Sequence, residues 1–172
     1  MRRQRGFSLI ELLIVVAVIL TIAAIAIPSL VRAKISANEA SAAACIRQIS
    51  TAQIAYAASY PLAGYATNLA ALGPGSGNSS CSSSGPTSST ACIIDDVLAS
   101  GTKSGYQFLA VGDAGGGPTP NTEFVSSSAP LSYNVTGTKN YCMVSDGVLR
   151  VNIGPGAIPP DVPTCSAYQS AQ

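Results

Sequence analysis

A long apolar run close to the N-terminus constrains the fold of this chain more than any other feature. Residues 7–31 read FSLIELLIVVAVILTIAAIAIPSLV, and Glu11 is their only ionisable side chain. About twenty uncharged residues follow Glu11, and at about 1.5 Å of rise per residue a helix of that length spans the roughly 30 Å of hydrocarbon in a bilayer. We therefore expect a membrane-spanning helix in this part of the chain.

Positive charge is distributed unevenly around the run. Arg2, Arg3 and Arg5 precede it, whereas Arg32 and Lys34 follow it. Because basic flanks are retained in the cytoplasm, the leading arginines favour an orientation that places the remainder of the chain outside the membrane. The two later cations reduce this preference to a modest bias.

Glu11 is unusual in such a helix. A carboxylate there costs about 2.5–3.5 kcal/mol on the insertion scale, so it usually has a partner and a function. The sequence has no basic side chain between Arg5 and Arg32. Cleavage between Gly6 and Phe7 would create an ammonium group about one helical turn from Glu11, in the same helix or in an adjacent copy. A buried charge that one subunit leaves half satisfied and the next completes would promote self-association.

The segment RRQRGFSLIELLIVVAVILTIAAIAIPSL closely resembles the start of type IV prepilins and of the related pseudopilins of type II secretion. The resemblance implies that a prepilin peptidase removes a basic leader after Gly6, that Phe7 is then N-methylated, and that Glu11 serves in filament assembly. Pro28 matches the helix-disturbing proline that these proteins tend to carry, and we expect a bend or a loosened turn just before it. Beyond about the first thirty residues the resemblance is architectural.

Two simpler interpretations compete with this one. An ordinary secretory signal peptide would be cut near Ala24-Ile25-Ala26, but its apolar region would be too long and would contain Glu11. A plain single-span anchor that carries a soluble domain would leave the placement of Gly6, Phe7 and Glu11 unexplained.

The helix is expected to continue as an amphipathic second half. Pro61 ends it, because a proline pushes the preceding residue out of helical geometry. Arg47, Ser50 and Thr51 lie away from the apolar stripe, which we expect to pack on the chain's own domain. The residues of this stripe are Ile35, Ala42, Ile46, Ile49, Gln53 and Tyr56.

A Ser-, Gly- and Pro-rich connector follows, with a helical turn expected at residues 68–72 and a short helix at 92–100 that Gly101 ends. We expect Asp95 and Asp96 to be ordinary surface charges near the start of that helix. From residue 105 the apolar period becomes two, which predicts strands at 105–111, 122–126, 131–135, 140–145 and 148–153.

Asp146-Gly147 predicts a two-residue hairpin turn between the last two strands. Alternation places Tyr141 and Met143 on one face of the sheet and Cys142 and Val144 on the other. Only the amphipathic half of the long helix is long enough to cover such a sheet.

The predicted fold class is therefore α+β: a long N-terminal helix packed on a small antiparallel sheet, as in type IV pilins. The predicted parts are a basic leader (1–6), a membrane-spanning or filament-core half of the helix (7–31), its amphipathic half (32–60), a variable connector (61–104), the sheet (105–154) and an extended, proline-rich C-terminal tail (155–172).

The cysteines point to disulfides in an exported domain. The pairs Cys81–Cys92, which closes a Ser/Gly-rich loop, and Cys142–Cys165, which pins the tail, are the preferred connectivity. Closing a loop of about ten to fifteen residues is worth about 2–3 kcal/mol in the loop-entropy model. Cys45 is then left as an unassigned thiol, although it could replace any of these partners.

Recognisable catalytic patterns are absent from the sequence, and we predict that the chain is not an enzyme and needs no cofactor. It has no histidine, no C-x-x-C pair and no phosphate loop, which argues against His-dependent nucleophiles, zinc and nucleotides. A calcium site built from scattered acids has no recognisable spacing; the acids are Asp113, Glu123, Asp146 and Asp161. With 9 Lys+Arg against 8 Asp+Glu, no basic face suggests a nucleic-acid site.

The resemblance implies a structural subunit of a type IV pilus-like filament that serves adhesion, twitching motility or DNA uptake. Its expected partners are the prepilin peptidase, identical or related pilin subunits, the inner membrane and the assembly machinery. It would be a single-pass inner-membrane precursor and then an extracellular or periplasmic filament. The alternatives are a type II secretion pseudopilin or minor pilin, and a membrane-tethered binding domain that never polymerises.

Overall fold

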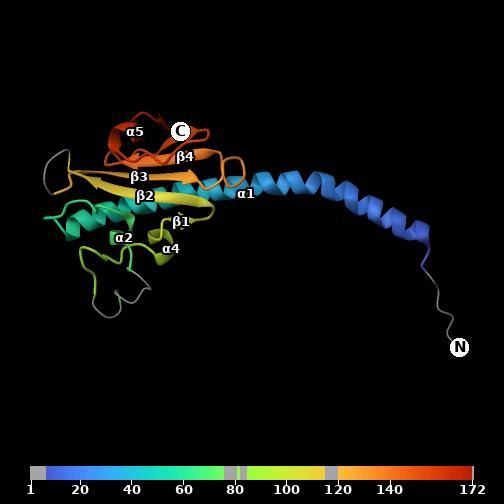
Figure 1. Cartoon of the computed structure of the whole chain (residues 1–172), viewed down its shortest axis with the longest axis horizontal. Coiled ribbons are helices and arrows are strands. Elements are labelled where there is room, and N and C mark those ends of the chain that lie inside the picture. Colours follow the sequence, from blue (N-terminus) through green and yellow to red (C-terminus); the bar gives the residue numbers. More distant parts are fainter. Residues whose placement is uncertain (1–6, 76–80, 82–84, 115–119, 172) are drawn as a thin grey trace. The chain divides into compact units, whose positions relative to one another are not determined.

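The computed structural model describes residues 7–75, 81, 85–114 and 120–171. The chain divides into an N-terminal unit, Met1–Lys34, and a second unit, Ile35–Gln172, which we call the head. One helix, α1 (Leu9–Ser59), contributes to both units (Figure 1). It continues through Pro28, so the proline does not end the helix, and the bend expected before Pro28 stays a prediction.

Within the head, α1 lies against a six-stranded antiparallel sheet, and this α+β architecture confirms the predicted fold class (Figure 1). The strands follow one another in space in the order of the sequence, and each pairs with the next. Their bounds are β1 (Thr102–Lys103), β2 (Tyr106–Asp113), β3 (Glu123–Pro130), β4 (Lys139–Val144), β5 (Arg150–Ile153) and β6 (Gln169–Ser170).

The amphipathic half of α1 is buried as predicted, but its buried face is wider than the predicted stripe. Ala42, Ile46 and Ile49 are fully buried, whereas Ser50, which we expected to lie away from the stripe, is buried as well. The Ser50 hydroxyl has no hydrogen-bond partner among the described residues. The helix is therefore embedded more deeply than its apolar residues alone indicate.

The two faces of the sheet belong to different cores, as the alternation in β4 predicts. Tyr141 and Met143 pack with α1, with Tyr106 and Phe108 in the same cluster. Cys142 and Val144 pack on the other face with Val125 and Cys165. The sheet is consequently covered on both sides, by α1 on one and by the C-terminal tail on the other.

The predicted strand at residues 131–135 is wrong. β3 instead runs to Pro130 and pairs along its whole length with β2, from Asp113 opposite Glu123 to Tyr106 opposite Pro130. Residues 131–138 form a loop, in which the Thr136 amide donates to the Ser132 carbonyl at 2.9 Å. A single long strand satisfies more backbone groups than two short ones, and this long-range pairing is not visible in local periodicity.

The predicted two-residue hairpin turn is also wrong. Cys142 lies opposite Arg150, so residues 145–149 form a longer connection between β4 and β5. Gly147, at φ +73°, donates its amide to the Val144 carbonyl at 3.0 Å. The Asp146 carboxylate accepts from the Val148 amide and from Arg150, which stabilises the wider turn.

Two short helices border the connector. α2 (Leu69–Leu72) begins after Asn68, whose side chain accepts from the Ala71 amide, as predicted for residues 68–72. α4 (Asp96–Ala99) begins later than predicted, since residues 91–94 hydrogen-bond to the α2 segment and Cys92 has φ +59°. Asp95 caps α4 by accepting from the Leu98 amide. Residues 76–80 and 82–84, which we expected to be loop, lie outside the described residues.

The sequence predicted an extended C-terminal tail. The tail instead contains a helix, α5 (Val162–Ser166), and the strand β6. The Asp161 carboxylate caps α5 by accepting from the Thr164 amide at 2.8 Å. Cys165 in α5 forms a disulfide with Cys142, at a Cα–Cα distance of 5.9 Å. The cap and the disulfide together hold this helix on the outer face of the sheet.

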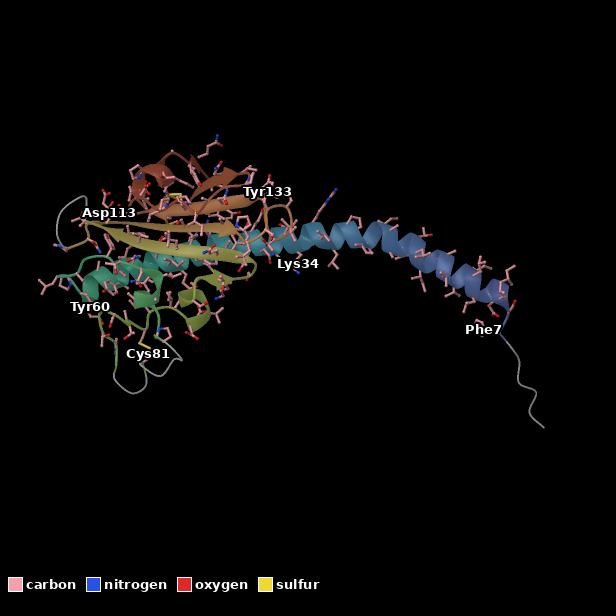
Figure 2. The ribbon with its side chains drawn as sticks, viewed as in Figure 1. Phe7, Lys34, Tyr60, Cys81, Asp113 and Tyr133 are labelled. Carbon is pink, nitrogen blue, oxygen red and sulfur yellow. A yellow bond between two sulfur atoms is a disulfide. The ribbon has the colours of Figure 1, made fainter. Side chains whose placement is uncertain are left out.

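The other disulfide joins Cys81 to Cys92, at a Cα–Cα distance of 6.0 Å (Figure 2). Both disulfides are the pairs preferred from the sequence, and Cys45 is the free cysteine. Cys45 is buried in the core between α1 and the sheet, and burial raises the pKa of its thiol. The reactive thiolate form is therefore disfavoured.

Candidate functional site

Two described residues precede the start of α1 and lie outside the helix. Phe7 and Ser8 precede α1, and the Ser8 carbonyl accepts from the amides of Glu11 at 3.1 Å and Leu12 at 3.2 Å. The side chain of Phe7 is 76% exposed. The predicted cleavage point therefore lies at a non-helical approach to the helix. Gly6 itself is outside the described residues.

Glu11 lies in the first turn of α1, and it is exposed. A carboxylate there is favoured by the helix dipole by about 0.3–1 kcal/mol. The ion pairs found within the described ranges are Lys103–Asp95, Lys139–Glu39 and Arg150–Asp146, and none of them involves Glu11.

The apolar side chains of the N-terminal unit form a continuous exposed surface. From Leu9 to Val31 the large ones are between 47% and 81% exposed. Burying one such side chain is worth about 1.5–3 kcal/mol, so a surface of this extent is stable only against lipid or other apolar surfaces. α1 is long and apolar enough to cross a membrane. The Thr21 hydroxyl donates to the Ala17 carbonyl at 2.8 Å, so this polar group is satisfied within the helix.

Sequence analysis missed a second acid in α1, Glu39, which attaches the helix to the head. Its side chain is only 9% exposed and accepts from the Thr138 amide at 2.9 Å and hydroxyl at 2.7 Å. Lys139 forms an ion pair with it at 3.1 Å. Burial alone would raise the pKa of Glu39, but the hydrogen bonds from Thr138 and the charge of Lys139 outweigh it, so the pKa lies below its usual value.

A signal for Glu39 was present in the sequence. Glu39 lies three residues before Ala42 and continues the apolar stripe at its regular spacing. Gln53 occupies another position of that stripe and is fully buried. It donates to the Ala66 carbonyl at 3.1 Å and accepts from the Ala66 amide at 2.8 Å. Glu39 thus joins α1 to a loop 99 residues away in the sequence, whereas Gln53 joins it to the connector only 13 residues further on.

Two of the four scattered acids considered for a calcium site have separate structural roles. Asp146 pairs with Arg150, and Asp161 caps α5. Asp113 and Glu123 lie opposite each other in β2 and β3. In the part of the chain that the structure describes, no three His, Cys, Asp or Glu side chains are grouped so that they could hold a metal ion.

Comparison with known proteins finds one match. Residues 1–27 match the family model described as the prokaryotic N-terminal methylation motif, which is the signature of type IV prepilins and pseudopilins. No curated protein and no solved structure matches the chain.

Proposed function

We propose that this chain is the structural subunit of a type IV pilus-like filament, made as an inner-membrane precursor, cut after Gly6 and methylated on Phe7. One observation carries the proposal. A methylation motif begins a helix whose apolar first half is exposed within the described structure, while its second half is packed in a folded head. Such a helix suits a protein that resides first in lipid and then among like helices.

Assembly would exchange one apolar environment for another. In the membrane, lipid covers the apolar residues of the N-terminal unit; in the filament, the same residues of neighbouring subunits cover them. Because lipid chains and apolar side chains are similarly apolar, the exchange costs little, and packing and polar pairing decide its direction. The head, which is closed around its own cores, accompanies the helix to the cell surface.

Glu11 would supply the polar pairing. Cleavage after Gly6 creates an ammonium group on Phe7, and methylation retains its positive charge. The Glu11 carboxylate of one subunit then pairs with the Phe7 ammonium of a neighbour in a water-poor bundle, where an unpaired charge is costly. The prepilin peptidase, further copies of the chain and the assembly machinery are the partners that this function requires.

Mass spectrometry of the N-terminus tests the proposal. Intact chain and N-terminal peptides are analysed from the membrane fraction and from filaments sheared off the cell surface. We expect a sheared chain that begins at Phe7 and carries one added methyl group. A chain that begins at Ile27 would identify a secreted domain, and a chain that retains Arg2 and occurs only in membranes would identify a tethered domain; either result contradicts the proposal.

The methylation motif is shared with pseudopilins, so abundance separates the two systems. A major pilin should be the dominant protein of the sheared fraction. A pseudopilin or minor pilin should be processed and methylated in the same way but scarce on the cell surface.

A further inference from the structure

One end of the head, where α1 enters it, carries exposed apolar side chains. We call it the entry end and define it by the loop 131–138 and by Ile153 of β5. The two are joined by a backbone hydrogen bond, since the Gly154 amide donates to the Thr138 carbonyl at 3.1 Å. Figure 2 shows Tyr133 at this end of the head.

The large side chains of the entry end are apolar and exposed to solvent. Leu131, Tyr133, Val135 and Ile153 are 56%, 37%, 65% and 70% exposed. Apolar side chains scattered singly are normal on a protein surface, whereas four of them at one end of a small head indicate a contact. Aliphatic side chains together with a tyrosine suit a membrane interface, where the tyrosine ring meets acyl chains and its hydroxyl meets headgroups.

The loop 131–138 is fixed before any contact forms. Asn38 of α1 donates to the Thr136 carbonyl at 3.0 Å, and the Leu131 amide donates to the Gly105 carbonyl at 3.0 Å. A loop held at both ends in this way presents its apolar side chains at little further entropic cost, as a preformed binding surface does.

The carboxylate that contacts this loop does not oppose an anionic surface. Glu39 accepts from the Thr138 amide, is buried, and forms an ion pair with Lys139. Its charge is therefore neutralised within the head, and lipid phosphates near the loop would not meet an exposed acid at this position.

The chain holds the entry end close to the proposed membrane span. The apolar run ends at Val31, seven residues before Asn38. In a helix these residues rise about 10 Å, and even fully extended they reach only about 25 Å. The headgroup layer is about 5–8 Å thick on each side of the hydrocarbon. The entry end is therefore within reach of the membrane surface for as long as the run spans the bilayer.

Two cations lie between the apolar run and the head. Arg32 and Lys34 are exposed, and neither takes part in the ion pairs found among the described residues. Long basic side chains that follow an apolar span extend their charges to the headgroup phosphates. They therefore favour a phospholipid surface next to the entry end.

We propose that the entry end inserts into the phospholipid surface from which α1 emerges. Its aliphatic side chains enter the outer part of the acyl layer, and Tyr133 lies at the level of the headgroups. The contact orients the head in the precursor and is released when the subunit leaves the membrane. The inference rests on the proposed membrane precursor and specifies which surface of the head meets the lipid.

Tryptophan fluorescence tests the contact, because the chain contains no tryptophan of its own. Val135→Trp is introduced into the full-length precursor, which is reconstituted in vesicles of phosphatidylethanolamine and phosphatidylglycerol. A fraction of the lipids carries bromine, which quenches tryptophan, near the headgroup end of the acyl chains. We expect the emission of Val135→Trp to lie at shorter wavelength than that of a matched control and to be quenched several-fold more strongly.

The matched control is Leu62→Trp. Leu62 is 90% exposed and follows the end of α1 at Ser59, which is about 30 Å from Asn38 along the helix. Tyr133→Trp is a second test variant that retains an aromatic ring in the loop. It should be quenched as Val135→Trp is, even if the larger side chain at position 135 disturbs the loop.

A third position separates this contact from the membrane precursor itself. Ile19→Trp, with bromine placed deeper in the acyl chains, reports whether the apolar run is in the bilayer. Quenching of Ile19→Trp, with Val135→Trp and Tyr133→Trp quenched no more than Leu62→Trp, overturns the contact and leaves the precursor standing. Absence of quenching at every position overturns both.

The same spectra distinguish lipid from protein as the partner. If the emission of Val135→Trp is shifted but bromination of the lipid does not quench it, and if the shift fades as the lipid-to-protein ratio rises, the entry end contacts another copy of the chain. That result also overturns the proposal.

Discussion

In the first half of α1 the large apolar side chains are exposed, whereas in the second half Ile46 and Ile49 are fully buried against the sheet. Both halves belong to one helix, so backbone structure does not distinguish them. Their side-chain patterns do: the first half is apolar on all sides, and the second has one apolar stripe. A stripe can be covered by a single sheet, but a helix that is apolar all round needs an apolar environment all round.

The acids of the two halves differ in the same way. Glu39 has hydrogen-bond donors and a lysine from its own head. Glu11 has no ion-pair partner among the described residues. Within the described residues, the second half of α1 therefore has both its acid and its apolar stripe covered by the head, whereas the acid of the first half has no ion-pair partner and its large apolar side chains are exposed.

The strongest test of this contrast is Glu11→Ala. We expect membrane insertion and cleavage after Gly6 to be unchanged but filament yield in the sheared fraction to fall more than tenfold, because the charge that completes the contact with a neighbour is lost. Glu11→Gln is the control that retains the shape of the side chain, and it should fail in the same way. Normal surface filaments built from Glu11→Ala would remove the pairing of Glu11 with Phe7.

Truncation of an isoleucine in each half compares burial directly. Ile46→Ala should lower the free energy of unfolding of the head by about 2–5 kcal/mol, because it opens a cavity in a closed core. Ile19→Ala, on the exposed first half, should leave thermal unfolding of the head in detergent unchanged. Equal effects of the two changes would show that the first half also stabilises the head.

Removing each disulfide in turn shows which of the two contributes more to the stability of the head. Loss of Cys142–Cys165, by substitution of both cysteines with Ser, should cost about 3 kcal/mol of head stability in the loop-entropy model. Loss of Cys81–Cys92 should cost slightly less, because it closes 11 residues rather than 23. Denaturant unfolding of the two double variants measures both values, and a larger loss at Cys81–Cys92 would contradict this order.

Acid titration tests Glu39. Its pKa is lower in the folded head than in the unfolded chain, so its stabilising effect is complete above the ordinary pKa of about 4.5 and is lost as the pH falls through the lower, folded value. Glu39→Gln should cost about 1–3 kcal/mol at neutral pH, from weaker hydrogen bonds to Thr138. It should also flatten the loss of stability below pH 4.5; an unchanged acid profile would exclude Glu39 as its source.

Much of the fold followed from local pattern. The apolar run, the stripe and the alternation in β4 predicted the long helix, its packing and the two faces of the sheet. Predictions from these patterns were reliable because each pattern repeats over several helical turns or several strand positions. The cysteine pairs followed as well, since the paired residues border a short loop and the C-terminal tail.

The sequence predictions were wrong where contacts between residues distant in the chain determine the local structure. Whether residues 131–135 form a strand depends on how far β3 pairs with β2, and the length of the β4–β5 turn depends on the pairing of Cys142 with Arg150. Glu39 was overlooked because a charged residue on an apolar stripe is meaningful only once Thr138 and Lys139 are known to meet it. For the candidate site, the motif identified Gly6, Phe7 and Glu11, and their roles stay predictions until processing is measured.

The two disulfides also bear on how a subunit responds to pulling. In the proposed filament, tension would reach the head through α1, and a head that unfolds under this force would lengthen by the contour length of its unfolded chain. At about 3.5 Å per residue, the disulfide Cys142–Cys165 prevents the 23-residue loop that it closes from adding about 80 Å to the extended chain. The disulfide Cys81–Cys92 likewise prevents its 11-residue loop from adding about 40 Å. With both disulfides formed, the unfolded head therefore has a shorter contour length than it would have after their reduction.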